Sequence, residues 1–502
     1  MSRLRRYAEY SVVMVGQSTV QRLASLLTNM VLARALGVMG FGVFSVVANT
    51  ASSAFGILRL GSEWAILVQT AERGTDTAKR SHGELLGAGL LLLLVSGVVG
   101  LAGCVVFAEP IAQGIFNDRS IAIWIRAAGV YTMFLCLSQF CSAALAGLER
   151  FTSYAKVAAS MSILQAASTA PAGVVFGLPG AVIASILVQA LTVVAIATIL
   201  RRALQEVGVQ VTFRHPFSSI CQLLAFGLPF HAAALVSIPV SYYMQGTLAW
   251  YFGVDSLGYL RAVTSVTMLV TFVPGTLATT VAVMLSSATQ PGHFAAETMR
   301  VLKLTSLFCV LIALLVSLAV PWLIPILFGA SYASTIGVAG LALTSSVLLA
   351  ISSTIQAALL SAQRPMDVLG LTLVQMSATL ISGQLLIVRH GLTGYFIADL
   401  IGHALRLTVV YCYSRRWLQK NLVAQEWLPK VLGLWCFLLM YSGVCISAGS
   451  NPPAKAALLG LAVMIGVSVW TYHSILDRDE RHILIRVCQR RTFQNIPAAT
   501  TD

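Results

Sequence analysis

Seven charged side chains lie inside stretches of this sequence that are otherwise apolar. They are Arg22, Arg59, Arg126, Arg261 and Arg406, together with the acids Glu63 and Asp399. A charge inside an apolar membrane segment costs at least ~2.5 kcal/mol, so it normally faces a cavity or a partner. A planar guanidinium group can donate two parallel hydrogen bonds to the oxygens of one phosphate. The excess of five cations over two anions therefore predicts a cavity for an anionic ligand.

Most of these charges belong to polar stripes on one face of an expected helix. The stripes, with spacings of three and four residues, are formed by Ser18, Arg22, Ser25 and Asn29, by Asn49, Ser52, Gly56, Arg59 and Glu63, and by Asp399, His403 and Arg406. Arg22 lies near mid-span and has no acidic neighbour on its stripe, so we expect it to be the principal cation of the cavity. Asn29, Arg59, Arg261, His403 and Arg406 are further candidate substrate-binding residues.

Ordinary packing offers an alternative for several of these charges. The alternatives are an ion pair between Arg59 and Glu63, a pair of Asp399 with Arg406 or Arg389, and the extension of Arg126 and Arg261 to the membrane interface. Glu63 and Asp399 are also the candidate groups for binding a coupling ion, either a proton or sodium, because buried acids in transporters can do so.

The composition predicts an all-α polytopic membrane protein. Of 502 residues 57% are hydrophobic and 10% are charged, with a mean hydropathy of +0.84. About fourteen runs are apolar and long enough to cross a bilayer. They are Ser11 to Leu36, Phe41 to Val68, Leu85 to Phe107, Ile121 to Gly147, Lys156 to Phe176, Gly180 to Leu200, Leu223 to Phe252, Leu257 to Ser287, four centred near Ile312, Val347, Ala378 and Leu405, then Val431 to Ser447 and Ala456 to Ile475.

The net charge of +14 reflects topology rather than a nucleic-acid partner. One side of the expected membrane segments carries 23 Lys and Arg residues and the other carries 4. Positively charged loops face the cytoplasm, so both termini are predicted to be cytoplasmic. The nine cysteines show no metal-binding spacing, and no phosphate-binding loop ending in Gly-Lys-Ser/Thr is present. Neither a metal nor another cofactor is expected.

The chain contains an internal duplication. Leu32 to Val47 aligns with Leu248 to Val263 at an offset of 216, and Gly177 to Gln205 aligns with Gly391 to Gln419 at an offset of 214, with 11 of 29 positions identical in the second pair. Both copies start on the same side of the membrane, which predicts two parallel bundles related by a twofold axis along the membrane normal.

The duplication sets the expected domain organisation. The predicted parts are a six-helix bundle at 1–205, a cytoplasmic linker at 206–222, a second six-helix bundle at 223–420, two additional helices at 421–476 and a basic cytoplasmic tail at 477–502. Gln245 takes the place of Asn29 in the second copy and is a further candidate binding residue, whereas Ile238 takes the place of Arg22. We therefore expect a cavity that is most basic on its N-terminal side.

A third relation concerns the sixth span. Ser185, Gln189 and Thr192 occupy the face that corresponds to Asp399, His403 and Arg406 in the twelfth span. The repeat thus places a polar stripe at the same position on both helices.

Two motifs carry a resemblance to a known family. Ala33 to Phe44 has an A-R-x-L-G turn followed by a Phe-Gly pair, and Leu145 to Arg150, echoed at Leu359 to Arg364, has the form of a cytoplasmic loop. Together they resemble the bacterial polysaccharide-export flippases of the multidrug/oligosaccharidyl-lipid/polysaccharide exporter superfamily. Met39-Gly40 departs from the acidic residue that relatives commonly have before the Phe-Gly pair, which leaves the subfamily open.

The resemblance implies a V-shaped fold in the bacterial inner membrane and an activity. The expected activity is the movement of an undecaprenyl-diphosphate-linked oligosaccharide from the cytoplasmic to the outer leaflet by alternating access. The expected partners are this anionic lipid-linked oligosaccharide, membrane lipids and other polysaccharide assembly proteins, and the protein is not expected to be an enzyme.

Two other classes compete with a flippase. Polysaccharide polymerases and ligases generally resemble one another in having a large outer loop. The longest outer loop expected here runs only from about Ala108 to Ser120. An ion-coupled multidrug exporter of the same superfamily would be expected to have an acid-rich cavity. Five arginines against two acids argue against that exporter.

Overall fold

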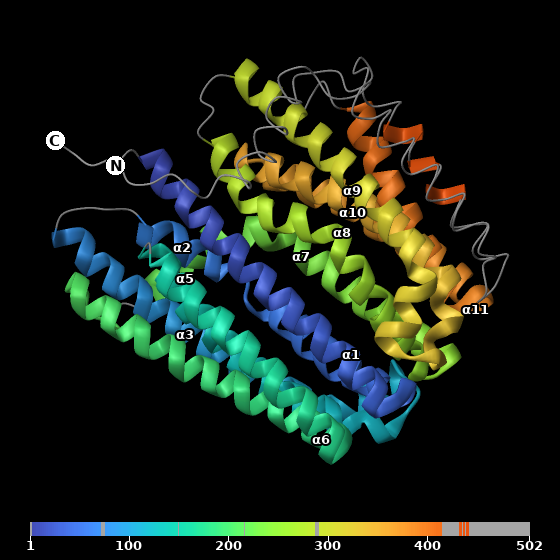
Figure 1. Ribbon diagram of the computed structural model, residues 1–502. Helices are drawn as coiled ribbons and strands as arrows, with labels where there is room; N and C mark the ends of the chain where they lie inside the picture. The colour runs from blue at the N-terminus through green and yellow to red at the C-terminus, as the bar shows by residue number, and fades with distance from the viewer. Residues whose placement is uncertain are drawn as a thin grey trace, which may run out of the picture.

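The computed structural model describes residues 3–71, 76–148, 150–214, 216–286, 291–413 and most of 431–440 (Figure 1). Over these ranges the chain is helical and contains no strand. Its elements are α1 (Arg3–Leu58), α2 (Ser62–Ala71), α3 (Asp76–Val106), α4 (Ala108–Gly114), η1 (Arg119–Ile121), α5 (Ala122–Gly147), α6 (Phe151–Val207), α7 (Pro216–Phe252), α8 (Asp255–Ser286), α9 (Pro291–Phe328), η2 (Ala330–Thr335), α10 (Ile336–Ser361) and α11 (Pro365–Cys412). Eight helices in the described part are long and apolar enough to cross a membrane.

Three of the helices are interrupted by one glycine with a left-handed backbone. Gly37 in α1, Gly177 in α6 and Gly391 in α11 have φ values of 66°, 65° and 54°. Side chains with a Cβ rarely adopt such a conformation. Each of the three helices covers two predicted spans, the first and second, the fifth and sixth, and the eleventh and twelfth.

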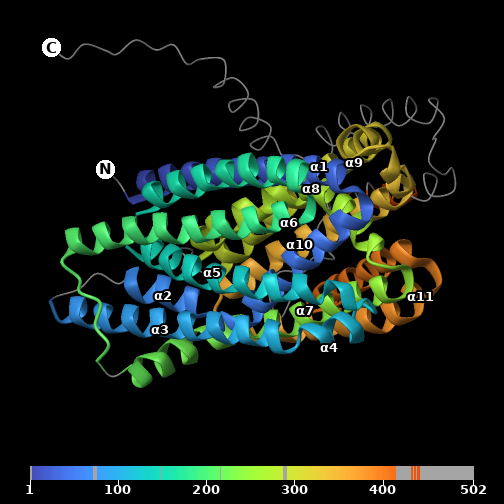
Figure 2. The same ribbon diagram turned by 90° about the horizontal axis from the view of Figure 1, so that it is seen from below.

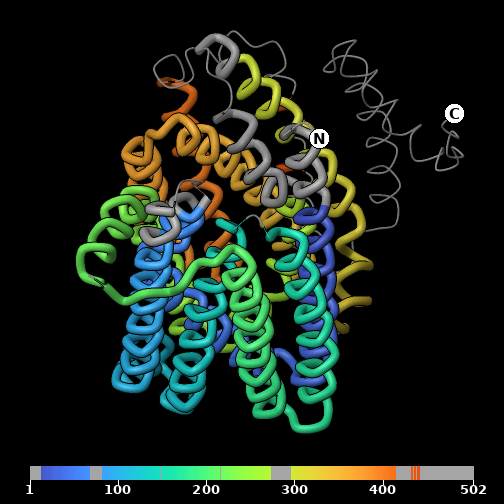
Figure 3. The backbone as a smooth tube through the Cα atoms, turned by 90° about the vertical axis from the view of Figure 1, so that its left-hand side faces the viewer, coloured from blue at the N-terminus to red at the C-terminus, as the bar shows by residue number. Residues whose placement is uncertain are grey.

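The chain doubles back at two of these glycines. Thr169 and Ser185, each eight residues from Gly177, lie with their hydroxyl oxygens 3.3 Å apart. Gln375 and His403 meet in the same way across Gly391, at 3.2 Å. Figure 3 shows the two halves of α6 as neighbouring segments joined by a tight turn. An uninterrupted helix of 57 residues would be ~85 Å long, far more than the ~30 Å hydrocarbon core.

The second predicted span ends earlier than expected. The prediction ran to Val68, but α1 ends at Leu58 and α2 begins at Ser62. Leu60 and Gly61 between them have positive φ values of 50° and 72°. A Cβ on Gly61 would lie 2.3 Å from the carbonyl oxygen of Gly227, so the break coincides with a direct backbone contact between α7 and the α1–α2 connection.

The two copies of the repeat contact each other reciprocally where α1 packs on α7 and α8 (Figures 1 and 2). Asn29 donates to Ser265 over 3.1 Å, and Asn49 donates to Gln245 over 2.6 Å. At the offset of 216, Asn29 corresponds to Gln245 and Asn49 corresponds to Ser265, so each hydrogen bond is the repeat-related copy of the other. These segments therefore obey the relation that a twofold axis requires.

The closest part of this contact is a glycine crossing. A Cβ on Gly42 would lie 2.3 Å from the carbonyl oxygen of Val254, and a Cβ on Gly258 would lie 2.3 Å from the carbonyl oxygen of Val38. These two contacts are also exchanged by the offset of 216. Glycine at both positions lets the two backbones touch.

The last two predicted spans lie largely outside the described residues. Of the span from Val431 to Ser447 only 431–433, 435–436 and 438–440 are described, and the span from Ala456 to Ile475 is not. The segment 477–502 also lies outside the described residues.

Candidate functional site

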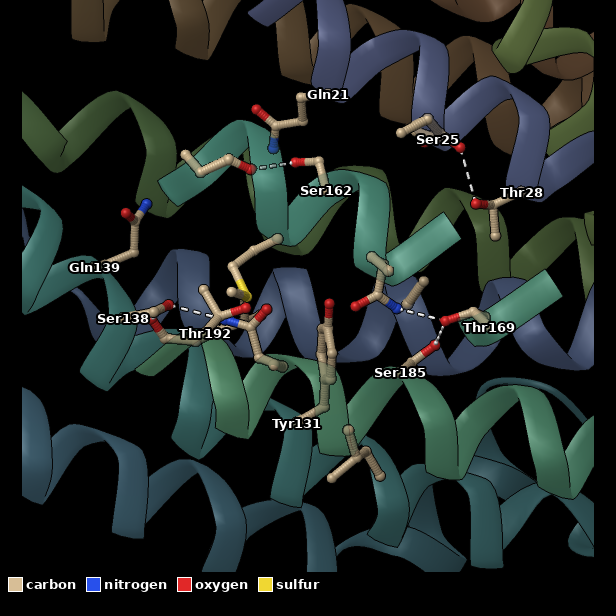
Figure 4. Close-up of a pocket in the computed structure, with 18 of the residues that line it drawn as sticks. Gln21, Ser25, Thr28, Tyr131, Ser138, Gln139, Ser162, Thr169, Ser185 and Thr192 are labelled. Carbon is tan, nitrogen blue, oxygen red and sulfur yellow. Dashed lines mark hydrogen bonds between the residues drawn. The ribbon is translucent and has the colours of Figure 1, made fainter. Parts of the chain in front are cut away.

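A cavity of about 550 Å³ lies among α1, α5 and α6 and is completed by one residue of α8 (Figure 4). Its polar lining consists almost wholly of side-chain amides and hydroxyls. They belong to Gln17, Gln21, Ser25, Thr28, Asn29, Tyr131, Ser138, Gln139, Ser142, Tyr154, Ser162, Gln165, Thr169, Ser185, Gln189 and Thr192, and Arg261 supplies the only charge of the described lining. The cavity is therefore polar but nearly uncharged.

Hydrogen bonds among the lining side chains hold several of these groups in place. Gln189 of α6 donates its amide to the hydroxyl of Ser138 on α5 over 2.9 Å. Gln165 donates to Thr169 over 2.7 Å, and Thr169 in turn lies next to Ser185. Figure 4 shows Thr169, Ser185 and Tyr131 around the same space. Pre-positioned amides and hydroxyls of this kind suit a ligand rich in hydroxyl groups.

Arg261 is placed in the cavity by the contact between α1 and α8. Ser265, one turn further along α8, donates to the carbonyl oxygen of Arg261 over 2.7 Å and accepts a hydrogen bond from Asn29 over 3.1 Å. The Nε atom of Arg261 is buried and has no hydrogen-bond partner among the described residues. A buried donor without a partner is costly, so this guanidinium is suited to receive an anionic group of a ligand.

The closest backbone contact between the two copies of the repeat lies on the Gly37 side of the cavity. Its lining residues on the first half of α1 run from Gln17 to Asn29, and the glycine crossing of Gly42 and Gly258 lies beyond them. Tyr332 of η2, which is fully buried, packs edge-on against Phe41 next to this crossing. The cavity thus lies on the side of the crossing that carries the N-terminal end of α1.

Two of the predicted binding residues, Asn29 and Arg261, line this cavity. The predicted face of Ser185, Gln189 and Thr192 also lines it. The alternative in which Arg261 extends to the membrane interface does not fit its place in the cavity lining, where its Nε atom is buried.

The other predicted cations lie outside this cavity. Arg22, expected to be the principal cation, stacks on the ring of Phe272 at 5.3 Å. Arg59 pairs with Glu63 over 2.5 Å, which is the packing alternative. Arg126 pairs with Glu109 over 2.8 Å, and both side chains are exposed. The expectation of a cavity that is most basic on its N-terminal side does not hold for the described lining, since its single cation, Arg261, comes from the second copy of the repeat.

The remaining predicted residues form a buried polar network between α10 and α11. Arg406 donates to Gln375 over 2.9 Å and to Gln356 over 3.4 Å, and Gln375 reaches His403. His403 lies 3.6 Å from one oxygen of Asp399, whose other oxygen accepts from Ser345. Asp399 thus has Ser345 and His403 as neighbours instead of the predicted Arg406 or Arg389.

Gln245 lies between this network and the first half of the chain. It accepts from Asn49 over 2.6 Å and lies near Tyr395, one turn before Asp399 on α11. The residue therefore joins the two copies of the repeat at their interface and does not line the cavity.

Several lining residues were missed by the sequence prediction. They lie on α5 and the first half of α6, at Ser138, Gln139 and Ser142, and at Ser162, Gln165 and Thr169. The second set has the same spacing of three and four residues as the stripes that were identified. These stripes contain no charged residue, so they lack the signal that marked the other stripes.

The chain is also similar to proteins that are already known. A family model described as polysaccharide biosynthesis protein matches residues 8–290. No curated protein matches the sequence significantly. The structure is similar to that of lipid II flippase MurJ in an inward closed conformation, with a TM-score of 0.69, 13% identity and coverage of 96% of this chain and 99% of that one. It is also similar to an inward-facing multidrug resistance MATE family transporter of the MOP superfamily, with a TM-score of 0.61, 17% identity and coverage of 82% and 98%.

Proposed function

Because the family model covers more than half of the chain, the protein belongs to the polysaccharide biosynthesis protein family, and we propose that it is a flippase for a lipid-linked oligosaccharide. The proposed substrate is an undecaprenyl-diphosphate-linked repeat unit, moved from the cytoplasmic to the outer leaflet of the bacterial inner membrane for polysaccharide assembly. The family and the membrane-spanning helices support this assignment.

The observation that carries the proposal is the composition of the cavity. Sixteen amide and hydroxyl side chains suit the hydroxyl groups of sugars, and the guanidinium of Arg261, whose Nε atom is buried, suits a phosphate. The fold is shared with multidrug transporters, so a drug exporter is the second candidate. The described lining contains no carboxylate that would attract a cationic drug, which favours the flippase.

The proposed architecture follows from the repeat. It consists of six-helix bundles at 1–205 and 223–420, joined by a linker at 206–222 and followed by two further helices at 421–476, with both termini in the cytoplasm. In this orientation the cavity faces the cytoplasm and the glycine crossing seals the outer end, as an inward-facing state of an alternating-access cycle requires.

Asp399 is the proposed site of ion coupling. Glu63 is already held by Arg59, whereas Asp399 lies beside a histidine and a serine in the buried network. We expect Asp399→Asn to remove the dependence of transport on a proton or sodium gradient while leaving gradient-independent movement. The measurement is flipping by reconstituted protein with and without each gradient, and Glu109→Gln at the exposed pair with Arg126 is the control. Unchanged gradient dependence in Asp399→Asn would remove this residue from coupling.

The function itself is tested by deletion of the gene. We expect lipid-linked oligosaccharide to accumulate in the inner leaflet, protected from a reagent that cannot cross the membrane. Accumulation of exposed but unpolymerised units would instead indicate a polymerase. Unaltered glycan export combined with increased sensitivity to cationic drugs would indicate a drug exporter.

A further inference from the structure

The face of α6 that lines the cavity carries fewer charges than the equivalent face of α11 in the second half of the chain. Ser185, Gln189 and Thr192 line the cavity, and the offset of 214 places Asp399, His403 and Arg406 at the same helical positions of α11. The fold therefore accepts ionisable side chains at these positions. The neutral lining is a property of the first copy's sequence, not a requirement of the architecture.

The single cation of the described lining is already outnumbered by the charges of the proposed substrate's diphosphate. A diphosphate diester already carries two negative charges, and Arg261 supplies one positive charge. Among the described lining residues a further anion would meet only amides and hydroxyls, which can donate hydrogen bonds but cannot neutralise it. Burying such an uncompensated charge away from water is unfavourable.

We propose that the cavity selects repeat units made of uncharged sugars and discriminates against units that contain an acidic sugar such as a uronic acid. This inference rests on the proposed function and adds the charge class of the glycan. The amide groups of Gln139, Gln165 and Gln189 bind sugar hydroxyls, and Arg261 binds the phosphate end.

The test compares two substrates in proteoliposomes containing the full-length protein. They are polyprenyl-diphosphate disaccharides that differ only at one C6 atom, a hydroxymethyl group in glucose and a carboxylate in glucuronic acid. We expect the neutral compound to be flipped on the order of tenfold faster, the ratio typical of one unsatisfied polar interaction. Equal or faster flipping of the acidic compound would overturn the inference.

A charge added to the lining shows whether the selection arises in the cavity. Thr192→Arg installs the residue that Arg406 provides in the second copy, and we expect it to bring the ratio of the two rates to about one or below. Thr192→Gln is the neutral control and should keep the preference. Gln139→Arg, on the facing helix α5, is a second variant in case the first does not fold (Figure 4).

The remaining outcomes also discriminate. A neutral preference that survives both arginine variants would place the selection outside the cavity and overturn the inference while the proposed function stands. If the parent protein flips neither compound, the proposed function fails, and the inference falls with it.

Discussion

Arg261→Ala is expected to reduce flipping by roughly 10- to 100-fold, because a hydrogen bond to a charged group contributes about 1.5 to 3 kcal/mol. Arg261 is the only charged residue of the described cavity lining. Its Nε atom has no hydrogen-bond partner among the described residues, so it is available to a bound ligand. Removing the side chain leaves no cation in the described lining for the diphosphate. Arg261→Lys keeps a point charge but loses the paired donors, so it should retain intermediate activity.

The control for this prediction is another intramembrane arginine. Arg126→Ala removes the same chemical group from an exposed pair with Glu109 outside the main cavity. Exposed ion pairs contribute only about 0 to 1 kcal/mol, so this variant should transport nearly as well as the parent. Initial flipping rates at equal amounts of folded protein provide the measurement. Similar rates for Arg261→Ala and the parent would exclude Arg261 from substrate binding.

Gly42→Ala is expected to open the sealed end of the cavity. The added Cβ would lie 2.3 Å from the carbonyl oxygen of Val254, a distance that forces the two backbones apart. Overpacking of this kind costs about 1 to 3 kcal/mol, which shifts the equilibrium between sealed and open states by roughly 5- to 150-fold. The double variant with Gly258→Ala places a second clash on the reciprocal contact and should have a larger effect.

Accessibility of the cavity from the outside measures this shift. A cysteine replacing Ser25 in the lining should react slowly with an impermeant thiol reagent in the parent background and faster when Gly42→Ala is added. Gly103→Ala is the matched control, because a Cβ there meets no atom within 4 Å. Unchanged labelling in the Gly42→Ala background would show that the crossing is not the seal.

The helical fold and the doubling of the chain could be predicted from sequence because both follow from local signals. Apolar runs define membrane segments, and the repeated glycines mark the turns between them. The break at Leu60 and Gly61 was not predictable in the same way. It is accompanied by a contact with Gly227, which is 166 residues away and leaves no local pattern.

The site was predicted only in part, for a related reason. Periodicity correctly identifies the polar face of a helix, and it found Asn29 and the face of Ser185, Gln189 and Thr192. It does not say which helices stand opposite one another. Arg22 and Arg59 lie on genuine polar stripes, but Phe272 and Glu63 occupy their guanidinium groups. Partners of this kind are decided by packing between distant segments.

The reciprocal contacts of α1 with α7 and α8 bear on how such a chain could originate. A half-length protein with these contacts would pair with a copy of itself through an isologous interface, in which every substitution appears twice. Fusion of the two copies removes that constraint. Arg22 stacks on Phe272, whereas the corresponding contact on the other side of the axis is Ile238 on Gly56. One continuous gene thus permits a cation on one side and a purely apolar contact on the other, a difference that a homodimer could not encode.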